Sequence, residues 1–244
     1  MPLLAKITFN VYNYSMKYDK ILFDLDNTII DFDDAEKNGI RLTFEEFSIP
    51  FKQEYLTSFH EINDNLWKML EKGLIERSNL IRVRFEKLFD LYDIKGVDPL
   101  EFNGKYLVNL SKGRKTIDGA TQTIEDVYNL GCKCFFITNG AIAVQKNRLI
   151  GQPFIKYISG VCVSESVGAK KPDKAFFDKA EELFKVKFDS KTLVVGDSLS
   201  SDIQGGINAN IDTCYVNRKR EKNTSGILPT YEIYDIRNLI DIIK

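Results

Sequence analysis

Ile21-Leu22-Phe23-Asp24-Leu25-Asp26-Asn27-Thr28 joins a short apolar run to two carboxylates. An apolar run of this length that ends so abruptly is typical of a buried strand in a parallel sheet. In open α/β sheets, ligands bind outside the carboxyl ends of the strands. Two acids at positions i and i+2 repel each other, so the sequence predicts a counter-charge beside them, most simply a hard cation.

The composition of the 244-residue chain is that of an ordinary globular protein. Its 34 Lys and Arg residues nearly balance 35 Asp and Glu residues, for a formal net charge of −1. This balance indicates neither a nucleic-acid surface nor an anionic-membrane surface. No apolar run approaches the roughly 20 residues that cross a bilayer, and the N-terminus lacks a secretory leader pattern. We therefore expect a cytoplasmic protein without nucleic-acid or membrane partners, either a monomer or a homodimer.

The cysteine and histidine residues exclude several kinds of site. Cys132, Cys134, Cys162 and Cys214 fall in apolar segments without a CxxC pair, which predicts small buried side chains in a reducing compartment. His60 is the sole histidine of the sequence, so a multi-histidine metal site is excluded within one chain. No GxSxG sequence accompanies it, which argues against a serine-histidine triad.

Short apolar strands alternate with helical patterns in most of the chain. We predict strands at Lys20–Phe23, Lys133–Ile137, Ile158–Val163, Thr192–Val195 and Thr213–Val216. Helices are predicted at Thr121–Leu130, Ala141–Ile150, Asp173–Phe184 and Ser200–Asn210. This alternation predicts an α/β, Rossmann-like fold with a parallel sheet of five or six strands flanked by helices. Residues 231–244 add a short strand and a short helix.

The gap between the first two predicted strands is too long for one crossover. It reads as four helices, at Asp34–Phe47, Lys52–Glu71, Glu76–Leu91 and Pro99–Leu110, with breaks at Pro50, Gly73 and Gly96. We predict a four-helix cap inserted directly after the acid pair. The expected division is an N-terminal extension at 1–15, a core at 16–32 and 113–244, and the cap at 33–112.

Four strand ends carry polar residues that are expected to meet at one edge of the sheet. The first carries Asp24 and Asp26, and the second runs into Thr138-Asn139-Gly140 and a helix, whose free N–H groups suit an anion. Lys171-Pro172 opens the next helix and offers a point charge for phosphate. The fourth strand runs into Gly196-Asp197, with Asp202 shortly after. Each motif is weak alone, but their order and placement predict a shared catalytic site.

These four motifs resemble those of the haloacid dehalogenase (HAD) superfamily, with a helical cap of the type inserted after the first motif. Within it the chain resembles the pyrimidine 5′-nucleotidases, through Thr28–Phe32, Leu66-Trp67 with Glu71-Lys72-Gly73, Arg84-Phe85 and Pro229–Glu232. The resemblance implies a Mg²⁺-dependent phosphate monoester hydrolase that acts through an aspartyl-phosphate. A nucleoside monophosphate, most simply a pyrimidine one, is then the expected small-molecule substrate.

The resemblance also implies residue roles. Asp24 would be the nucleophile and Asp26 the general acid and base. Asp24, the carbonyl of Asp26 and Asp197 would bind Mg²⁺, with Asp202 orienting a water or Lys171 behind them. Thr138, Asn139 and Lys171 would bind the phosphoryl oxygens. Candidate residues for reading the leaving group from the cap are Phe32, Trp67, Lys72 and Arg84, although each also fits a packing or surface role.

Alternative readings share the fold. A dehalogenase needs no second acid, because a halide leaves without protonation, so Asp26 favours phosphoryl chemistry. A sugar-phosphate phosphatase or a phosphomutase keeps both acids, although mutases usually carry Gly where this chain has Asn27. A non-catalytic binding module predicts the loss of at least one key residue, yet Asp24, Asp26, Lys171 and Asp197 are all present.

Overall fold

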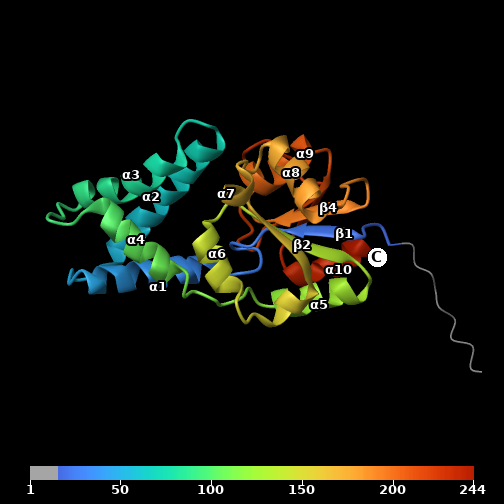
Figure 1. The fold of residues 1–244 in the computed structure, drawn as a ribbon, viewed down its shortest axis with the longest axis horizontal. Coiled ribbons are helices and arrows are strands. Elements are labelled where there is room, and N and C mark those ends of the chain that lie inside the picture. The colour runs from blue at the N-terminus through green and yellow to red at the C-terminus, as the bar shows by residue number, and fades with distance from the viewer. Residues whose placement is uncertain (1–15) are drawn as a thin grey trace, which may run out of the picture.

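The central sheet has six parallel strands. Residues 16–244 are described by the structure, a computed structural model (Figure 1). The predicted extension at 1–15 lies outside the described residues. The strands run in the order β3-β2-β1-β4-β5-β6. Their bounds are β1 (Lys20–Phe23), β2 (Lys133–Thr138), β3 (Ile158–Val163), β4 (Thr192–Gly196), β5 (Asp212–Val216) and β6 (Tyr231–Ile233). The predicted parallel sheet is confirmed, including the strand in the tail.

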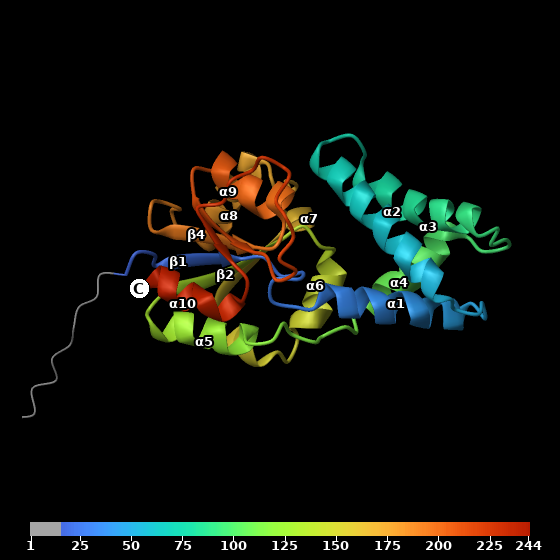
Figure 2. The same cartoon turned by 180° about the vertical axis from the view of Figure 1, so that it is seen from behind.

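Helices cover both faces of the sheet, as Figures 1 and 2 show. Successive residues of a strand point to opposite faces. Accordingly Ile21 and Phe23 pack on the side of α5 (Ala120–Asn129) and α10 (Leu239–Ile243). Leu22 packs on the side of α8 (Lys174–Phe184), whose neighbour is α9 (Gln204–Asn208). Burial on both faces explains why the central strands are continuously apolar. The four cysteines are buried and free, as predicted.

The insertion between β1 and β2 is a bundle of four helices, drawn beside the sheet in Figure 1. Its members are α1 (Phe32–Glu46), α2 (Gln53–Glu71), α3 (Arg77–Leu91) and α4 (Pro99–Leu110). Helix α1 begins two residues earlier than predicted. The cause is the Asp31 side chain, which caps the helix by accepting a hydrogen bond from the backbone N–H of Asp34. The bundle has its own apolar core of aromatic rings, separate from the two clusters on the sheet.

The two chain segments that connect the bundle to the sheet lie side by side. The backbone N–H of Asp31 donates to the carbonyl of Lys115 at 2.9 Å, and the N–H of Ile117 donates to the carbonyl of Ile29 at 2.9 Å. An ion pair of 2.8 Å between Lys115 and Asp31 adds to this contact. We propose the division of the chain at these paired linkers, with the helical cap at 33–112. Among the described residues, no helix is long and apolar enough to cross a membrane.

One predicted helix has a different form. In place of a continuous helix at Ser200–Asn210, the chain forms a π-helical turn, η2 (Leu199–Ile203), followed by α9. The N–H of Ile203 bonds to the carbonyl of Ser198, five residues back, at 3.1 Å. The Ser198 N–H also donates to the Asp202 carboxylate at 3.1 Å. This local bond directs Asp202 back toward the strand ends, which an α-helical periodicity does not predict.

The remaining short elements complete the rim near the bundle. Helix α6 (Ile142–Leu149) follows β2, and the 3₁₀ turn η1 (Pro153–Tyr157) leads into β3. Helix α7 (Ser164–Val167) follows β3, and the 3₁₀ turn η3 (Ile236–Asn238) precedes α10. Figure 1 shows α6 and α7 between the sheet and the helical bundle. Any group at the carboxyl ends of the strands therefore lies beneath the bundle.

The aromatic core of the bundle generates a stability prediction. Phe85 is fully buried, and its ring lies 4.9 Å from the rings of both Phe59 and Phe102. Phe85→Ala is expected to lower the free energy of unfolding in urea by about 3–5 kcal/mol, because it leaves a cavity among rings. Leu91→Ala, on the same helix but 59% exposed, is the control and should change it by less than about 0.5 kcal/mol. Equal effects would show that the bundle lacks a specifically packed core.

Candidate active site

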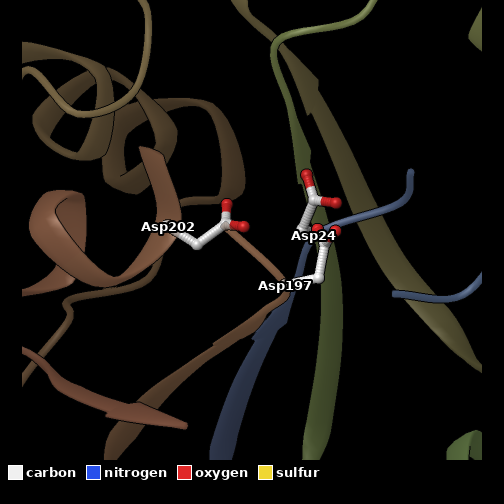
Figure 3. A group of neighbouring side chains, drawn as sticks. All are labelled: Asp24, Asp197 and Asp202. Atoms are coloured by element: carbon white, nitrogen blue, oxygen red, sulfur yellow. The ribbon is translucent and has the colours of Figure 1, made fainter. Parts of the chain in front are cut away.

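Three carboxylates converge at the carboxyl edge of the sheet. Asp24 directly follows β1, Asp197 directly follows β4, and Asp202 lies in η2. The N–H of Asp24 donates to the carbonyl of Val195 at 2.9 Å, which continues the β1–β4 pairing by one residue. Figure 3 shows Asp24 and Asp197 beside each other, with Asp202 facing them from the helical turn. One carboxylate oxygen from each lies within 4.8 Å of the other two.

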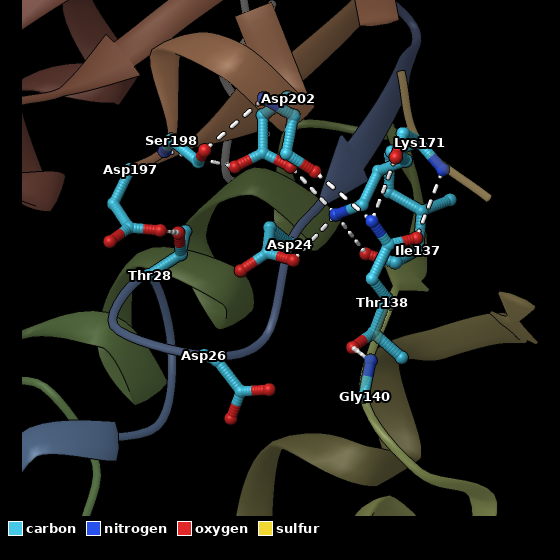
Figure 4. Close-up of polar contacts among 12 residues, drawn as sticks. Asp24, Asp26, Thr28, Ile137, Thr138, Gly140, Lys171, Asp197, Ser198 and Asp202 are labelled. Carbon is cyan, nitrogen blue, oxygen red and sulfur yellow. Dashed lines mark hydrogen bonds and ion pairs between the residues drawn. The ribbon is translucent and has the colours of Figure 1, made fainter. Parts of the chain in front are cut away.

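The ammonium of Lys171 lies between two of these acids. Its Nζ donates to Asp24 Oδ1 at 2.6 Å, to Asp202 Oδ1 at 2.6 Å and to the carbonyl of Ile137 at 3.0 Å (Figure 4). These bonds use all three hydrogens of the ammonium. Lys171 is only 1% exposed, so water screens this interaction little. The structure thus joins three of the predicted site residues.

Burial controls the pKa values of the cluster. Burial raises the pKa of Asp24 to about 8, although Lys171 opposes this rise. Burial and the nearby Asp24 also hold the pKa of Asp197 well above its ordinary value. Burial alone would lower the pKa of Lys171, but Asp202 and Asp24 outweigh it and raise that pKa. Three carboxylates thus lie close to the single ammonium of Lys171, so a further positive charge would be stabilised beside them.

The donor set fits a hard divalent cation. Carboxylate oxygens are the preferred ligands of Mg²⁺, which binds through one or two carboxylates and keeps several waters. Asp24 and Asp197 are suited to this role, since Asp202 already bonds Lys171 and the N–H of Ser198. Thr28 donates to Asp197 Oδ1 at 3.5 Å, which fixes that carboxylate from the side. These contacts fit the predicted supporting role of Asp202.

Asp26 lies apart from the three-acid cluster. Its Oδ2 accepts from Gln145 Nε2 at 2.6 Å, and its Oδ1 is paired with Arg148 Nη1. The side chain is 27% exposed and lines the same cavity as Asp24. The structure therefore places the two acids of the first motif in different electrostatic surroundings. Gln145 and Arg148 were missed by the sequence analysis, although they lie at i and i+3 on the helix after Thr138.

Thr138 and Asn139 lie at the end of β2. Thr138 Oγ1 accepts from the N–H of Gly140 at 3.0 Å, and the residue is 1% exposed. The Asn139 side chain bonds both backbone groups of Lys171: Oδ1 accepts from its N–H and Nδ2 donates to its carbonyl, each at 2.9 Å. Asn139 therefore positions the loop that carries Lys171. Its predicted contribution to phosphate binding would come from its backbone N–H.

A cavity of about 350 Å³ lies between the strand ends and the helical bundle. Three of the four predicted cap residues, Phe32, Trp67 and Arg84, belong to its lining. Lys72 does not: it is exposed and directly follows Glu71, the last residue of α2. The sequence pattern could not show which residue at the end of this helix lines the cavity, because neighbouring residues there point in different directions. Glu71, its neighbour, lines the cavity and accepts from Ser200 Oγ at 2.6 Å.

Arg84 is nearly fully buried in a polar network of the bundle. Its Nη1 donates to Asn63 Oδ1 at 3.1 Å and its Nε donates to Asn103 Oδ1 at 3.0 Å. Asn63 in turn donates to Glu36, whose other oxygen bonds His60 Nδ1 at 2.7 Å. This network forms part of the cavity wall. Glu36, His60 and Asn63 carried no local sequence signal, since they come from two helices that only the fold brings together.

Arg77 connects the bundle to the sheet. From the start of α3 it donates to Glu165 Oε1 at 2.9 Å and to the carbonyl of Asn139. Its guanidinium also lies 5.2 Å from the centre of the Trp67 ring. The contact fixes Trp67 at the cavity wall, so Trp67 both packs and faces the site.

The fold and this site define a Rossmann-like α/β protein that has an inserted helical bundle and a carboxylate cluster at the carboxyl edge of its sheet. Residues 21–216 match the sequence profile of the haloacid dehalogenase-like hydrolases. The chain therefore belongs to this family of enzymes, as its motifs predict.

Several relatives match nearly the whole chain. The HAD-hydrolase YfnB of Bacillus subtilis is 34% identical over 93% of this chain and 96% of its own. Its crystal structure, described as bound to magnesium and as showing interdomain movement, superposes with a TM-score of 0.88 over 93% of this chain and 99% of that one. The pyrimidine 5′-nucleotidases PynA of Streptococcus pneumoniae and YjjG of Escherichia coli are 34% and 32% identical. They cover 93% and 92% of this chain, and the alignments span 95% and 97% of their own lengths.

Gly196 generates a prediction about the cluster. A Cβ at this position would lie 2.3 Å from Asp202 Cγ, far inside van der Waals contact. Gly196→Ala should therefore displace the Asp202 carboxylate and lower the free energy of unfolding by about 1–3 kcal/mol. Gly104→Ala adds the same methyl group to α4 where a Cβ meets nothing within 4 Å, and should be neutral or stabilising by up to about 1 kcal/mol. Urea unfolding compares the two; an unchanged Gly196→Ala would contradict the close approach.

Proposed function

We propose that the protein is a Mg²⁺-dependent phosphate monoester hydrolase that forms an aspartyl-phosphate on Asp24. The observation that carries the proposal is the division of the two acids. Asp24 lies against Lys171 and beside Asp197, while Asp26 is held separately by Gln145 and Arg148 in the same cavity. A site of this kind separates a nucleophile from a proton donor.

In the first step, an oxygen of Asp24 attacks phosphorus, and the bond from phosphorus to the leaving oxygen breaks. Asp26 gives its proton to the departing alkoxide. In the second step, Asp26 takes a proton from water, which attacks the aspartyl-phosphate and releases inorganic phosphate and Asp24. The hydrogen bond from Lys171 to Asp24 orients the carboxylate for attack on the phosphoryl group.

Charge on the phosphoryl oxygens would be stabilised by the Lys171 ammonium, the Thr138 hydroxyl and the N–H of Asn139. Asp24, Asp197 and the carbonyl of Asp26 would hold Mg²⁺, which supplies further positive charge for the same oxygens. The magnesium in the YfnB structure supports this assignment, as does the surplus of carboxylates over ammonium groups in the cluster. Asp202 would keep Lys171 in place.

The proposed substrate is a pyrimidine nucleoside 5′-monophosphate. The names of PynA and YjjG support it, since both are similar to this chain over nearly their whole length. The cavity also combines apolar walls with the Glu36, Asn63 and Arg84 network, which suits a leaving group with a flat ring and polar edges. A sugar-phosphate phosphatase or phosphomutase is the alternative. The four free cysteines favour a reducing, cytoplasmic setting.

Asp24→Asn tests the nucleophile. The amide is a far poorer nucleophile, so the variant should lose at least about 10³-fold in kcat. Phosphate release is measured with Mg²⁺ on a panel of nucleoside monophosphates and sugar phosphates, with a wild-type circular-dichroism spectrum and a cooperative melting transition as the folding control. Full activity of Asp24→Asn would refute the mechanism. Sugar phosphates that far outperform pyrimidine monophosphates would refute the substrate assignment alone.

The binding of Mg²⁺ should depend on pH. Because the pKa of Asp24 is raised to about 8 from 3.8 in the metal-free protein, protons compete with the cation below that pH. Without metal, the folded chain holds a proton that the unfolded chain releases, so stability should fall as pH rises from about 4 to about 8. Titration calorimetry should show at least tenfold tighter Mg²⁺ binding at about pH 8 than at about pH 6. Binding that is unaffected by pH, or retained in Asp197→Asn, would contradict the assigned ligands.

A further inference from the structure

The carboxylate of Asp26 is held by two side chains from one face of α6. Arg148 Nη1 pairs with Oδ1 and Gln145 Nε2 donates to Oδ2 at 2.6 Å, so each oxygen has its own partner. Arg148 is 0% exposed and Gln145 is 1% exposed. Two fully buried partners hold a side chain that itself faces the cavity. Their contact therefore fixes the direction in which Asp26 points.

The orientation of the Gln145 amide follows from its partners. The NH₂ group of Gln145 faces Asp26, because Nε2 donates to Asp26 Oδ2 at 2.6 Å and only the nitrogen of an amide carries hydrogens. Its second hydrogen is donated to Thr138 Oγ1 at 3.1 Å. One amide thus connects the proposed proton donor with a residue proposed to bind the phosphoryl group. The distance between these two groups is set by the side chain of Gln145.

Both partners of Asp26 also carry a buried polar atom without a hydrogen-bond partner. Within residues 16–244, Gln145 Oε1 and Arg148 Nη2 are buried and unpaired. An unpaired buried polar group costs roughly 1–3 kcal/mol, so apolar side chains of similar shape would pack better here. Packing alone therefore does not explain the two residues. A role toward Asp26 does.

Arg148 contacts the start of the first helix of the bundle and the end of the last one. Its Nε donates to the carbonyl of Leu110, the last residue of α4, at 3.4 Å. Its guanidinium lies 5.5 Å from the centre of the Phe32 ring, at the first residue of α1. These contacts, together with Asp26, hold the guanidinium plane in one orientation.

From this arrangement we propose that Gln145 and Arg148 are positioning residues that direct Asp26 toward the leaving-group oxygen of the substrate. The proposal rests on the proposed function, because Asp26 acts there as the proton donor. Neither residue attacks the substrate or exchanges a proton with it; of the groups that do, both contact only the Asp26 carboxylate. Each acts by holding a carboxylate in the geometry that proton transfer requires.

The dependence of the rate on the leaving group tests this role. An alkoxide leaves only with a proton, whereas the nitrophenolate of p-nitrophenyl phosphate leaves without one. A misplaced Asp26 should therefore slow the hydrolysis of an alkyl phosphate more than that of p-nitrophenyl phosphate. We define the ratio as kcat/KM for the alkyl phosphate divided by kcat/KM for p-nitrophenyl phosphate. In Gln145→Leu and Arg148→Met this ratio should fall at least about tenfold, and the fall should come from kcat.

Gln152→Leu is the matched control. Gln152 is a buried glutamine whose Nε2 donates to the carbonyl of Arg114 at 2.9 Å, and its loss should leave the ratio unchanged. Arg148→Lys keeps the charge but not the planar fork, and should lower the ratio less than Arg148→Met. It also serves if Arg148→Met fails to fold. An equal loss on both substrates, or no loss, in the folded variants would overturn the proposal.

The alkyl phosphate is the one that the wild-type protein hydrolyses fastest in the substrate panel. The ratio therefore does not depend on the identity of the base. A wild-type protein that hydrolyses p-nitrophenyl phosphate and a sugar phosphate, but no pyrimidine nucleotide, would refute the proposed substrate and leave this test intact. If Asp26→Asn failed to lower the ratio, the assignment of the proton donor would fail, and the positioning role with it.

Discussion

The ion pair that Lys171 forms with Asp24 and Asp202 is the interaction on which the rest of the site depends. A buried ammonium is stable only with its charge and hydrogen bonds satisfied, and here two carboxylates and one backbone carbonyl satisfy them. The same ammonium permits three carboxylates to lie within 4.8 Å of one another. Much of the surrounding structure serves to hold this group, from the π-helical turn that directs Asp202 inward to the Asn139 side chain that bonds both backbone groups of Lys171.

The surplus negative charge that remains defines what the edge of the sheet can bind. Three acids against one ammonium favour a divalent cation, and the cation with Lys171 favours an anion such as phosphate. Arg148 pairs with Asp26 outside this cluster and also contacts Phe32, the first residue of α1, and Leu110, the last residue of α4. Arg148 therefore connects the helical bundle to Asp26, the proposed proton donor, and Arg77 connects the bundle to the strand ends. Charged side chains therefore contribute to the contact between the helical bundle and the sheet, in addition to the fit of their surfaces.

The sequence predicted the parallel sheet, the four-helix insertion and the convergence of Asp24, Thr138, Lys171 and Asp197, because each lies at or just beyond a strand end or at a helix start. Strand topology alone brings such residues together. The partners of Asp26 were not predicted, since the role of a polar residue on a helix depends on which face is buried. The Glu36 and Arg84 network joins helices that are distant along the chain, and no local pattern encodes such a pairing. Lys72 lies outside the cavity lining while its neighbour Glu71 belongs to it, because successive residues of a helix point about 100° apart around its axis.

The covalent step on Asp24 is the central claim, and chemical trapping tests it most directly. Borohydride reduces an acyl phosphate to an alcohol, so an aspartyl-phosphate becomes homoserine. The protein is quenched with borohydride during turnover, digested and analysed by peptide mass spectrometry. The account predicts homoserine at position 24, dependent on both substrate and Mg²⁺, with Asp26, Asp197 and Asp202 unchanged. Homoserine at another position, or unmodified Asp24 under conditions of rapid turnover, would contradict it.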